Sequence, residues 1–218
     1  MIPKEKFENA KHTVLIVEEE NFPLGSALYS YVLTLHKKVS FVANKKIKKK
    51  FAFLPWYDKL RESVPSSCDL RYEVGTSTLE LFEFFQQNGI KINAKMATAL
   101  YASLLIEYNF FRSAACDGII FALASELIAL QAEYKLCRNY LQYRVPLSQI
   151  RLKGLLFQKV ILTNNAKHAE LFVTNEELSA CGASFEDCYE VLEDILMIVH
   201  VTKVILRDDN KNKIVKEV

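Results

Sequence analysis

Short apolar runs and helical patterns alternate in the first part of the chain. Residues 13–17 (TVLIV) are all apolar or β-branched, which is typical of a strand that is buried on both faces. The segment NFPLGS then leads into a helix that extends to about residue 35, because ALYSYVLTL carries an apolar stripe. Residues 38–43 (KVSFVA) predict a second strand. A strand, a helix and a strand in this order form a βαβ unit, which implies a parallel sheet with a right-handed crossover.

The pattern after this unit is mainly helical. A third strand is predicted at residues 69–74 (DLRYEV), and a helix at residues 77–87 begins with a capping box of Ser77 and Glu80. Residues 96–112 (MATALYASLLIEYNFFR) predict a central helix, because apolar side chains recur there at three- and four-residue spacing. The other expected elements are a lead-in helix at 4–11, helices at 119–131, 134–143 and 185–195, a short amphipathic segment at 148–153, strands at 157–163 and 169–173 around the turn at 164–165, a capped helix from residue 174, a strand at 201–207 and a fraying charged tail at 208–218.

The dipeptide Val145-Pro146 interrupts the helical pattern and predicts a domain boundary. Residues 1–145 are expected to form a domain with a parallel sheet and a helical middle. Residues 146–218 are expected to form a small α+β domain. The predicted fold class is therefore α/β.

The composition is that of an ordinary globular protein and excludes several classes. Of the 218 residues, 6 are glycine and 5 are proline, which is too few for long linkers or for an all-β fold rich in tight turns. The formal net charge of +2 is too small to imply a nucleic-acid or membrane partner by itself. The N-terminus is polar, and the apolar runs are shorter than a membrane span. The five scattered cysteines, without a CxxC pair, favour reduced and mostly buried thiols in a cytoplasmic protein.

Two charged runs follow the first two predicted strands. Residues 18–20 are three consecutive glutamates at the end of the first strand, which is the usual ligand edge of an α/β sheet. The run at residues 45–50 (KKIKKK) offers a possible contact for an anionic partner. The aromatic segment at residues 51–57 (FAFLPWY) is expected to anchor this loop to the core.

The order of these segments resembles the DHH phosphoesterases, in particular the RecJ-like oligoribonuclease and pAp-phosphatase group. HTVLIV with LGSALYSYVLTLHKKVSFVAN is similar to the family's first strand, glycine-serine turn, helix and second strand, and FAFLP resembles its phenylalanine-leucine-proline loop. STLELFEFF and GIKINAKMATALYASLLIEYNFFRS resemble its linking helices and the helix that ends in an aspartate-threonine-glycine turn. The resemblance implies a DHH-like domain at residues 1–145 and a partial, truncated DHH-associated domain at residues 146–218.

The family hydrolyses phosphoesters with two divalent metals, usually manganese, which need several Asp and His ligands in one cleft. Its first motif reads His-x-Asn-Pro-Asp-x-Asp-x-x-Gly-Ser, and this chain keeps Gly25 and Ser26 of it. At the other motif positions the chain has Ile16, Glu18, Glu19, Glu20 and Phe22. Glu20 keeps a carboxylate where one aspartate belongs, whereas Phe22 has no metal ligand to offer.

The other metal-binding motifs of the family are also altered. Gly75 stands at the second ligand aspartate, the Asp-His-His signature is absent, and Glu107-Tyr108-Asn109 replaces the aspartate-threonine-glycine turn. The glycine-rich phosphate-binding loop does not follow the last predicted strand. We therefore expect an inactive hydrolase with no catalytic residue, no metal ligand and no cofactor. The residues expected at its vestigial cleft are Glu18, Glu20, Phe22, Gly25, Ser26, Gly75, Glu107 and Tyr108.

Three functions are compatible with this sequence. The first is an inactive phosphoesterase relative that binds a protein partner or acts in assembly. The second is a residual phosphoesterase or nuclease on short oligonucleotides, with Mn²⁺ bound through Glu18, Glu20 and Glu107. The third is a nucleic-acid-binding protein that contacts its ligand through Lys45, Lys46, Lys48, Lys49 and Lys50.

Overall fold

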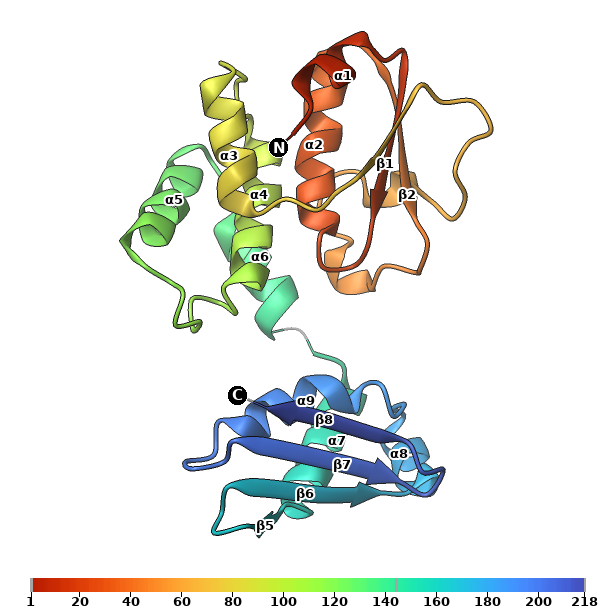
Figure 1. Ribbon diagram of the computed structural model, residues 1–218, viewed down its shortest axis with the longest axis vertical. Coiled ribbons are helices and arrows are strands. Elements are labelled where there is room, and N and C mark those ends of the chain that lie inside the picture. The colour runs from red at the N-terminus through yellow and green to blue at the C-terminus, as the bar shows by residue number, and fades with distance from the viewer. Residues whose placement is uncertain (1, 144, 218) are drawn as a thin grey trace. The chain divides into compact units, whose positions relative to one another are not determined.

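The computed structural model describes residues 2–143 and 145–217 (Figure 1). The chain divides into two compact units, Met1–Arg144 and Val145–Val218, which are described separately below. The boundary expected from the sequence lay between residues 145 and 146. Within the described residues, no helix has both the length and the apolarity that crossing a membrane requires.

The first unit contains a four-stranded sheet in the order β3-β2-β1-β4 with every pair parallel. The strands are β1 (His12–Val17), β2 (Lys38–Ala43), β3 (Leu60–Arg61) and β4 (Leu70–Glu73), and α1 (Lys4–Asn9) and α2 (Phe22–Thr34) flank β1 in the chain. The predicted parallel βαβ unit is confirmed. Strand β3 was not predicted, because two residues are too short to form an apolar pattern.

The helical half of this unit is organised around α4, as expected for the central helix. Its elements are α3 (Thr78–Gln87), α4 (Ala94–Glu107), α5 (Gly118–Ala129), α6 (Tyr134–Arg138) and a π-helical turn, η3 (Asn139–Tyr143). Helix α4 packs against α2, α3, α5 and α6, and its residues from Met96 to Leu105 are buried (Figure 1). The predicted capping box of Ser77 and Glu80 is present at the start of α3.

The central helix ends earlier than predicted. Its last residue is Glu107 rather than Arg112, because Asn109, Phe110 and Phe111 have positive φ values of 46°, 56° and 63°. The N–H of Phe110 donates to the carbonyl of Leu105 at 2.6 Å, and the N–H of Asn109 donates to that of Ile106 at 3.1 Å. This pair of bonds is a Schellman motif, in which Asn109 takes the left-handed position that asparagine tolerates.

The second unit is a mixed sheet in the order β5-β6-β7-β8, covered on one face by helices (Figure 1). Strands β6 and β7 are parallel, and the other two pairs are antiparallel. The elements are α7 (Leu147–Gln158), β5 (Ile161–Thr163), β6 (His168–Val173), α8 (Asn175–Cys181), α9 (Cys188–Leu196), β7 (Lys203–Asp208) and β8 (Lys213–Glu217). Its core forms where buried side chains of α7 and α9, such as Leu152 and Leu192, meet Leu171 and Leu206 of the sheet.

Two expectations for the second unit were wrong. The segment expected at residues 148–153 belongs to the longer helix α7, so the following strand begins at Ile161 rather than at residue 157. The tail did not fray, because residues 213–217 pair with β7 as an antiparallel edge strand in which Leu206 faces Ile214. Burial alternates along KIVKE as in a half-buried strand, but its charged and apolar residues do not alternate, so no strand pattern is visible in the sequence there.

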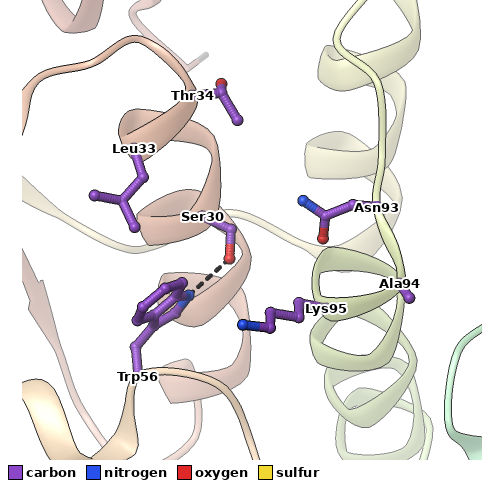
Figure 2. A pocket seen from close by; sticks show the side chains of 7 residues that line it. All are labelled: Ser30, Leu33, Thr34, Trp56, Asn93, Ala94 and Lys95. Carbon is purple, nitrogen blue, oxygen red and sulfur yellow. Dashed lines mark hydrogen bonds between the residues drawn. The ribbon is translucent and has the colours of Figure 1, made fainter.

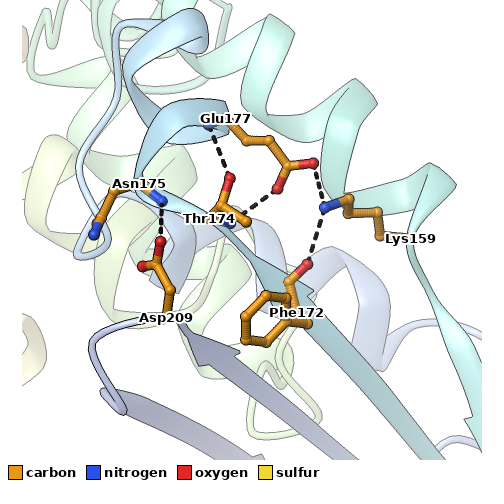
Figure 3. Close-up of polar contacts among 6 residues, drawn as sticks. All are labelled: Lys159, Phe172, Thr174, Asn175, Glu177 and Asp209. Carbon is orange, nitrogen blue, oxygen red and sulfur yellow. Dashed lines mark hydrogen bonds and ion pairs between the residues drawn. The ribbon is translucent and has the colours of Figure 1, made fainter.

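A polar cluster joins three elements of the second unit (Figure 3). Thr174 and Glu177 form the capping box predicted at the start of α8. The ammonium group of Lys159 forms an ion pair with Glu177 and donates to the carbonyl of Phe172 at 3.2 Å. The hydrogen bond from Lys159 is the main cause that lowers the pKa of Glu177, followed by the backbone hydrogen bond from Thr174.

The cysteines are less buried than predicted. Cys137 and Cys188 are buried, whereas Cys68, Cys116 and Cys181 are partly exposed, and all five are free. Burial raises the pKa of both the Cys137 and the Cys188 thiol to about 12. The two buried thiols are therefore protonated and unreactive at neutral pH.

Candidate functional site

The candidate site lies at the carboxyl edge of the first sheet, which we define as residues 18–22, 44–50 and 74–78 together with Glu107, which contacts Thr78, and Tyr108, which follows it. Strands β2 and β4 both pair in parallel with β1, so the segments that follow the three strands meet at one edge. Ligands of open α/β sheets bind outside the carboxyl ends of the strands. The chemistry of this edge therefore depends on what its side chains contact.

Asn21 joins the segment after β1 to the end of β4. Its side-chain oxygen accepts from the N–H of Glu18 at 2.8 Å, and its side-chain nitrogen donates to the carbonyl of Val74. Asn21 falls on a spacer position of the family's first motif, between Glu20 and Phe22, so the motif gave it no role. An asparagine directly before an apolar helix is a capping signal, but here its side chain bonds across the sheet edge instead of capping α2.

One of the three glutamates after β1, Glu19, forms ion pairs with the lysine run after β2. The carboxylate of Glu19 lies 3.7 Å from the ammonium groups of both Lys48 and Lys50. Glu18 and Glu20 are exposed to solvent. Exposed ion pairs of this kind contribute about 0–1 kcal/mol to stability, so they orient the two loops more than they stabilise the fold.

Phe22, Gly25 and Ser26 lie in the packed interior of the unit. The Phe22 ring is fully buried and stacks on Phe41 with ring centroids 5.3 Å apart. It also has edge contacts at 5.8 Å with Phe51 and Tyr57. Phe22 therefore fills the core beneath the aromatic loop and does not plug an open cleft.

The two residues kept from the family motif have packing roles. A methyl group on Gly25 would lie 2.4 Å from Cγ1 of Val17 and 2.8 Å from the ring of Phe41. The Ser26 hydroxyl donates to the carbonyl of Pro55 at 2.8 Å and so attaches α2 to the aromatic loop. Close approach of helix and sheet is a sufficient physical reason for glycine at this position.

Glu107, the last residue of α4, accepts hydrogen bonds from the first residue of α3. Its carboxylate accepts from the backbone N–H of Thr78 at 2.9 Å and from the Thr78 hydroxyl at 2.7 Å. A negative charge at a helix N-terminus is favourable. The next residue, Tyr108, is half-buried, and burial raises its pKa, with the charge of Glu107 as a further cause. Gly75 is exposed, and a methyl group there would meet nothing within 4 Å.

The predicted residues are thus brought to the same part of the unit but not into one ligand set. Among residues 2–143 and 145–217, no three His, Cys, Asp or Glu side chains converge in a way that could hold a metal. The carboxylate of Glu107 is hydrogen-bonded to Thr78 at the start of α3, and the carboxylate of Glu19 is paired with two lysines. Phe22 has no atom that could coordinate a metal. The donor set at this edge does not fit a two-metal centre.

The lysine run is an exposed segment that buried apolar residues within it and after it attach to the core. Ile47 is buried, and its carbonyl accepts from the Tyr57 hydroxyl at 2.8 Å. Phe51 and Leu54 are also buried, so the aromatic segment anchors the loop as predicted. The side chains of Lys45, Lys46, Lys48 and Lys49 are exposed around this anchor.

A groove that was not predicted from the sequence lies between α2 and the start of α4 (Figure 2). Its volume is about 500 Å³. Its lining residues are Ser30, Leu33, Thr34, Trp56, Asn93, Ala94 and Lys95. The sequence offered no signal for it, because its two walls are separated by about sixty residues and each wall has the pattern of an ordinary helix or loop.

Comparison with known proteins identifies the fold but no family. No family model matches the sequence, and no curated protein matches it. The solved structure of an exopolyphosphatase-related protein from Bacteroides fragilis matches 99% of this chain and 82% of its own, with a TM-score of 0.83 and 12% identity. A putative family II inorganic pyrophosphatase from Methanococcus jannaschii aligns over 95% of this chain and 68% of its own at 14% identity, but its TM-score of 0.33 is too low to support an argument. The first match shows that the chain has the fold of a phosphatase-related protein.

Proposed function

We infer that this protein is a catalytically inactive relative of the DHH phosphoesterases that acts by binding another protein. The observation that carries the inference is the use of the carboxyl-edge side chains in structural contacts. Asn21 bridges two strand ends, Glu107 accepts hydrogen bonds at the start of α3, and Phe22 belongs to the core. The fold shared with an exopolyphosphatase-related protein supports the ancestry that the sequence motifs imply.

Helix α5 supports the proposed protein partner. Phe121 and Ile128 are 55% and 37% exposed and lie seven residues apart on one side of this helix, whereas Ile119, which is 60% exposed, lies about 200° around the helix from Phe121. The Phe121 ring stacks on Phe111 at 5.5 Å, and this pairing fixes its position at the surface. Large apolar side chains that are exposed next to one another mark an interaction surface.

The absence of catalysis is tested with a dinucleotide substrate and Mn²⁺. We expect no turnover above the buffer rate at any Mn²⁺ concentration. Manganese-dependent hydrolysis that disappears in the double variant Glu20→Gln/Glu107→Gln would establish the residual phosphoesterase instead. The double variant is checked for folding by circular dichroism, so that a loss of activity is not mistaken for a loss of structure.

The protein-binding function is tested by cross-linking in extracts of the source cells with a matched pair of variants. Phe121→Ser removes an exposed ring from α5, and Phe172→Ser removes a ring of similar exposure, 50%, from the second unit. We expect a defined partner to be cross-linked to the parent and to the Phe172 variant but not to the Phe121 variant. Equal loss in both variants, or no cross-linked protein in any of them, would refute the inference.

A second candidate function, binding of a nucleic acid or another polyanion, is supported by the lysine loop. Within the described part of the chain, Lys48 and Lys50 form ion pairs, whereas no ion pair is found for Lys45, Lys46 or Lys49. Binding through these side chains releases counterions from the nucleic acid and therefore weakens steeply with salt. Fluorescence anisotropy with a short labelled RNA at low salt is the test, and lack of binding there removes this candidate.

A further inference from the structure

The groove between α2 and the start of α4 is open to solvent and is lined mainly by apolar surface. Its volume of about 500 Å³ falls within the range of about 300–1,000 Å³ that is typical of ligand pockets. Leu33, Ala94 and Trp56 provide apolar wall, and the polar groups of the lining belong to Ser30, Thr34, Asn93 and Lys95 (Figure 2). None of the groove residues belongs to the carboxyl edge or to α5, so a ligand in the groove would be independent of the proposed function.

Trp56 is held in a fixed position at one wall of the groove. Its φ of +69° is rare for a bulky residue, because the left-handed region crowds its Cβ. The indole N–H donates to the Ser30 hydroxyl at 2.8 Å, and that hydroxyl donates to the carbonyl of Ser26 at 3.0 Å. The ring also packs against Tyr29 with centroids 5.1 Å apart. The ring is therefore held in place, and it offers the groove only the part of its surface that Tyr29 leaves uncovered.

Lys95 supplies the only charge among the residues that line the groove. It is exposed, and its side chain extends from the second residue of α4 toward Trp56 (Figure 2). Its ammonium group lies 5.1 Å from the centre of the Trp56 ring, and no ion pair is found for it among residues 2–143 and 145–217. A cation beside an apolar wall attracts a ligand that carries one anionic group and one flat apolar part.

We propose that this groove binds a small organic anion with a flat apolar body. The anionic group contacts the Lys95 ammonium, and the apolar body lies between the Trp56 ring and the side chain of Leu33. The groove has a single cation, so it favours a monoanion over a polyanion such as RNA. Because the groove is open to solvent, it contacts one side of a small bound molecule, and a longer acidic peptide would extend beyond its walls.

The test uses 2-naphthoate, its neutral analogue 2-naphthamide, and the one tryptophan in the chain. Because Trp56 is the only tryptophan, the single indole N–H signal in a ¹H–¹⁵N NMR spectrum reports on this groove. We expect 2-naphthoate to shift this signal to saturation. We expect binding about tenfold weaker for 2-naphthamide and for the variant Lys95→Met, since each removes one charge of the contact.

A matched variant excludes a general effect of charge. Lys91→Met removes a lysine that is exposed and near in sequence but does not line the groove, and it is expected to bind 2-naphthoate like the parent. Lys95 is also exposed, so its substitution leaves the core intact, and an unchanged spectrum outside the groove confirms this. The proposal is overturned if the indole signal does not move, if the acid and the amide bind equally, or if Lys91→Met weakens binding as much as Lys95→Met. It is also overturned if an acidic peptide without an aromatic residue saturates the groove at lower concentration than 2-naphthoate.

Discussion

Replacement of Gly25 by alanine tests whether the retained glycine of the family motif serves packing. The added methyl group would lie 2.4 Å from Cγ1 of Val17, whereas carbon atoms pack at about 3.5–4.0 Å. The overlap exceeds about 1 Å against side chains that are almost fully buried, and α2 is attached to the aromatic loop through Ser26 and cannot retreat freely. Overpacking costs about 1–3 kcal/mol, and an overlap of more than about 1 Å with buried side chains belongs at the upper end of this range, at about 2–3 kcal/mol. Alanine returns about 1 kcal/mol through its helix propensity.

We therefore expect Gly25→Ala to lower the free energy of unfolding of the first unit by about 1–2 kcal/mol. With a urea m-value of about 2 kcal/mol/M, the midpoint shifts down by roughly 0.5–1 M. Trp56 fluorescence is the assay, because the only tryptophan lies in this unit and follows its unfolding.

Gly154→Ala is the matched control. Gly154 lies within α7, and a methyl group there would meet nothing within 4 Å. Alanine should stabilise the second unit by about 0.5–1 kcal/mol and leave the Trp56 transition unchanged. If the Gly25→Ala protein unfolds at the same urea concentration as the parent, the close packing around Gly25 is not the reason for glycine at this position.

Three further predictions concern single contacts. Glu107→Gln should lower the stability of the first unit by about 0.3–1 kcal/mol in urea unfolding, because it removes a charge at the start of α3. Native protein should react with a thiol reagent at no more than three of its five cysteines at pH 8, since burial raises the pKa of Cys137 and Cys188 to about 12, and unfolded protein should react at five. Because the pKa of Glu177 is lowered in the folded state, its contact with Lys159 stabilises the second unit above the unfolded pKa of about 4.3 and is lost as the pH falls through the lower folded value. Lys159→Met should therefore flatten the acid limb of a pH–stability curve.

The sequence predicted the elements whose signals are local. The capping boxes at Ser77 and Thr174 and the parallel strands around α2 are confirmed, because hydrogen bonding near a helix start and apolar runs need no tertiary information. Strand β8 was missed because its charges resemble those of a disordered tail, and its pairing partner lies in β7. Asn109 is a residue that often ends a helix, but the apolar residues Phe110 and Phe111 after it led to the prediction that α4 continues to Arg112.

The candidate site was predictable in position but not in contacts. The motif comparison directed attention to Glu18, Phe22 and Glu107, and the structure brings these segments to one edge of the unit. Nothing local indicates that Phe22 belongs to the core or that Asn21 bridges two strands, because both depend on segments about twenty to fifty residues away. The groove at Trp56 depends in the same way on the meeting of two helices.

Titration of the protein with Mn²⁺, followed by the electron paramagnetic resonance signal of the free ion, tests the central claim most directly. If the carboxyl-edge side chains are committed to structural contacts, the free-ion signal should follow the added Mn²⁺ with no saturable loss at micromolar concentration. Two tightly bound ions per chain, both lost in the Glu20→Gln/Glu107→Gln variant, would contradict the account and place a working metal centre at this edge.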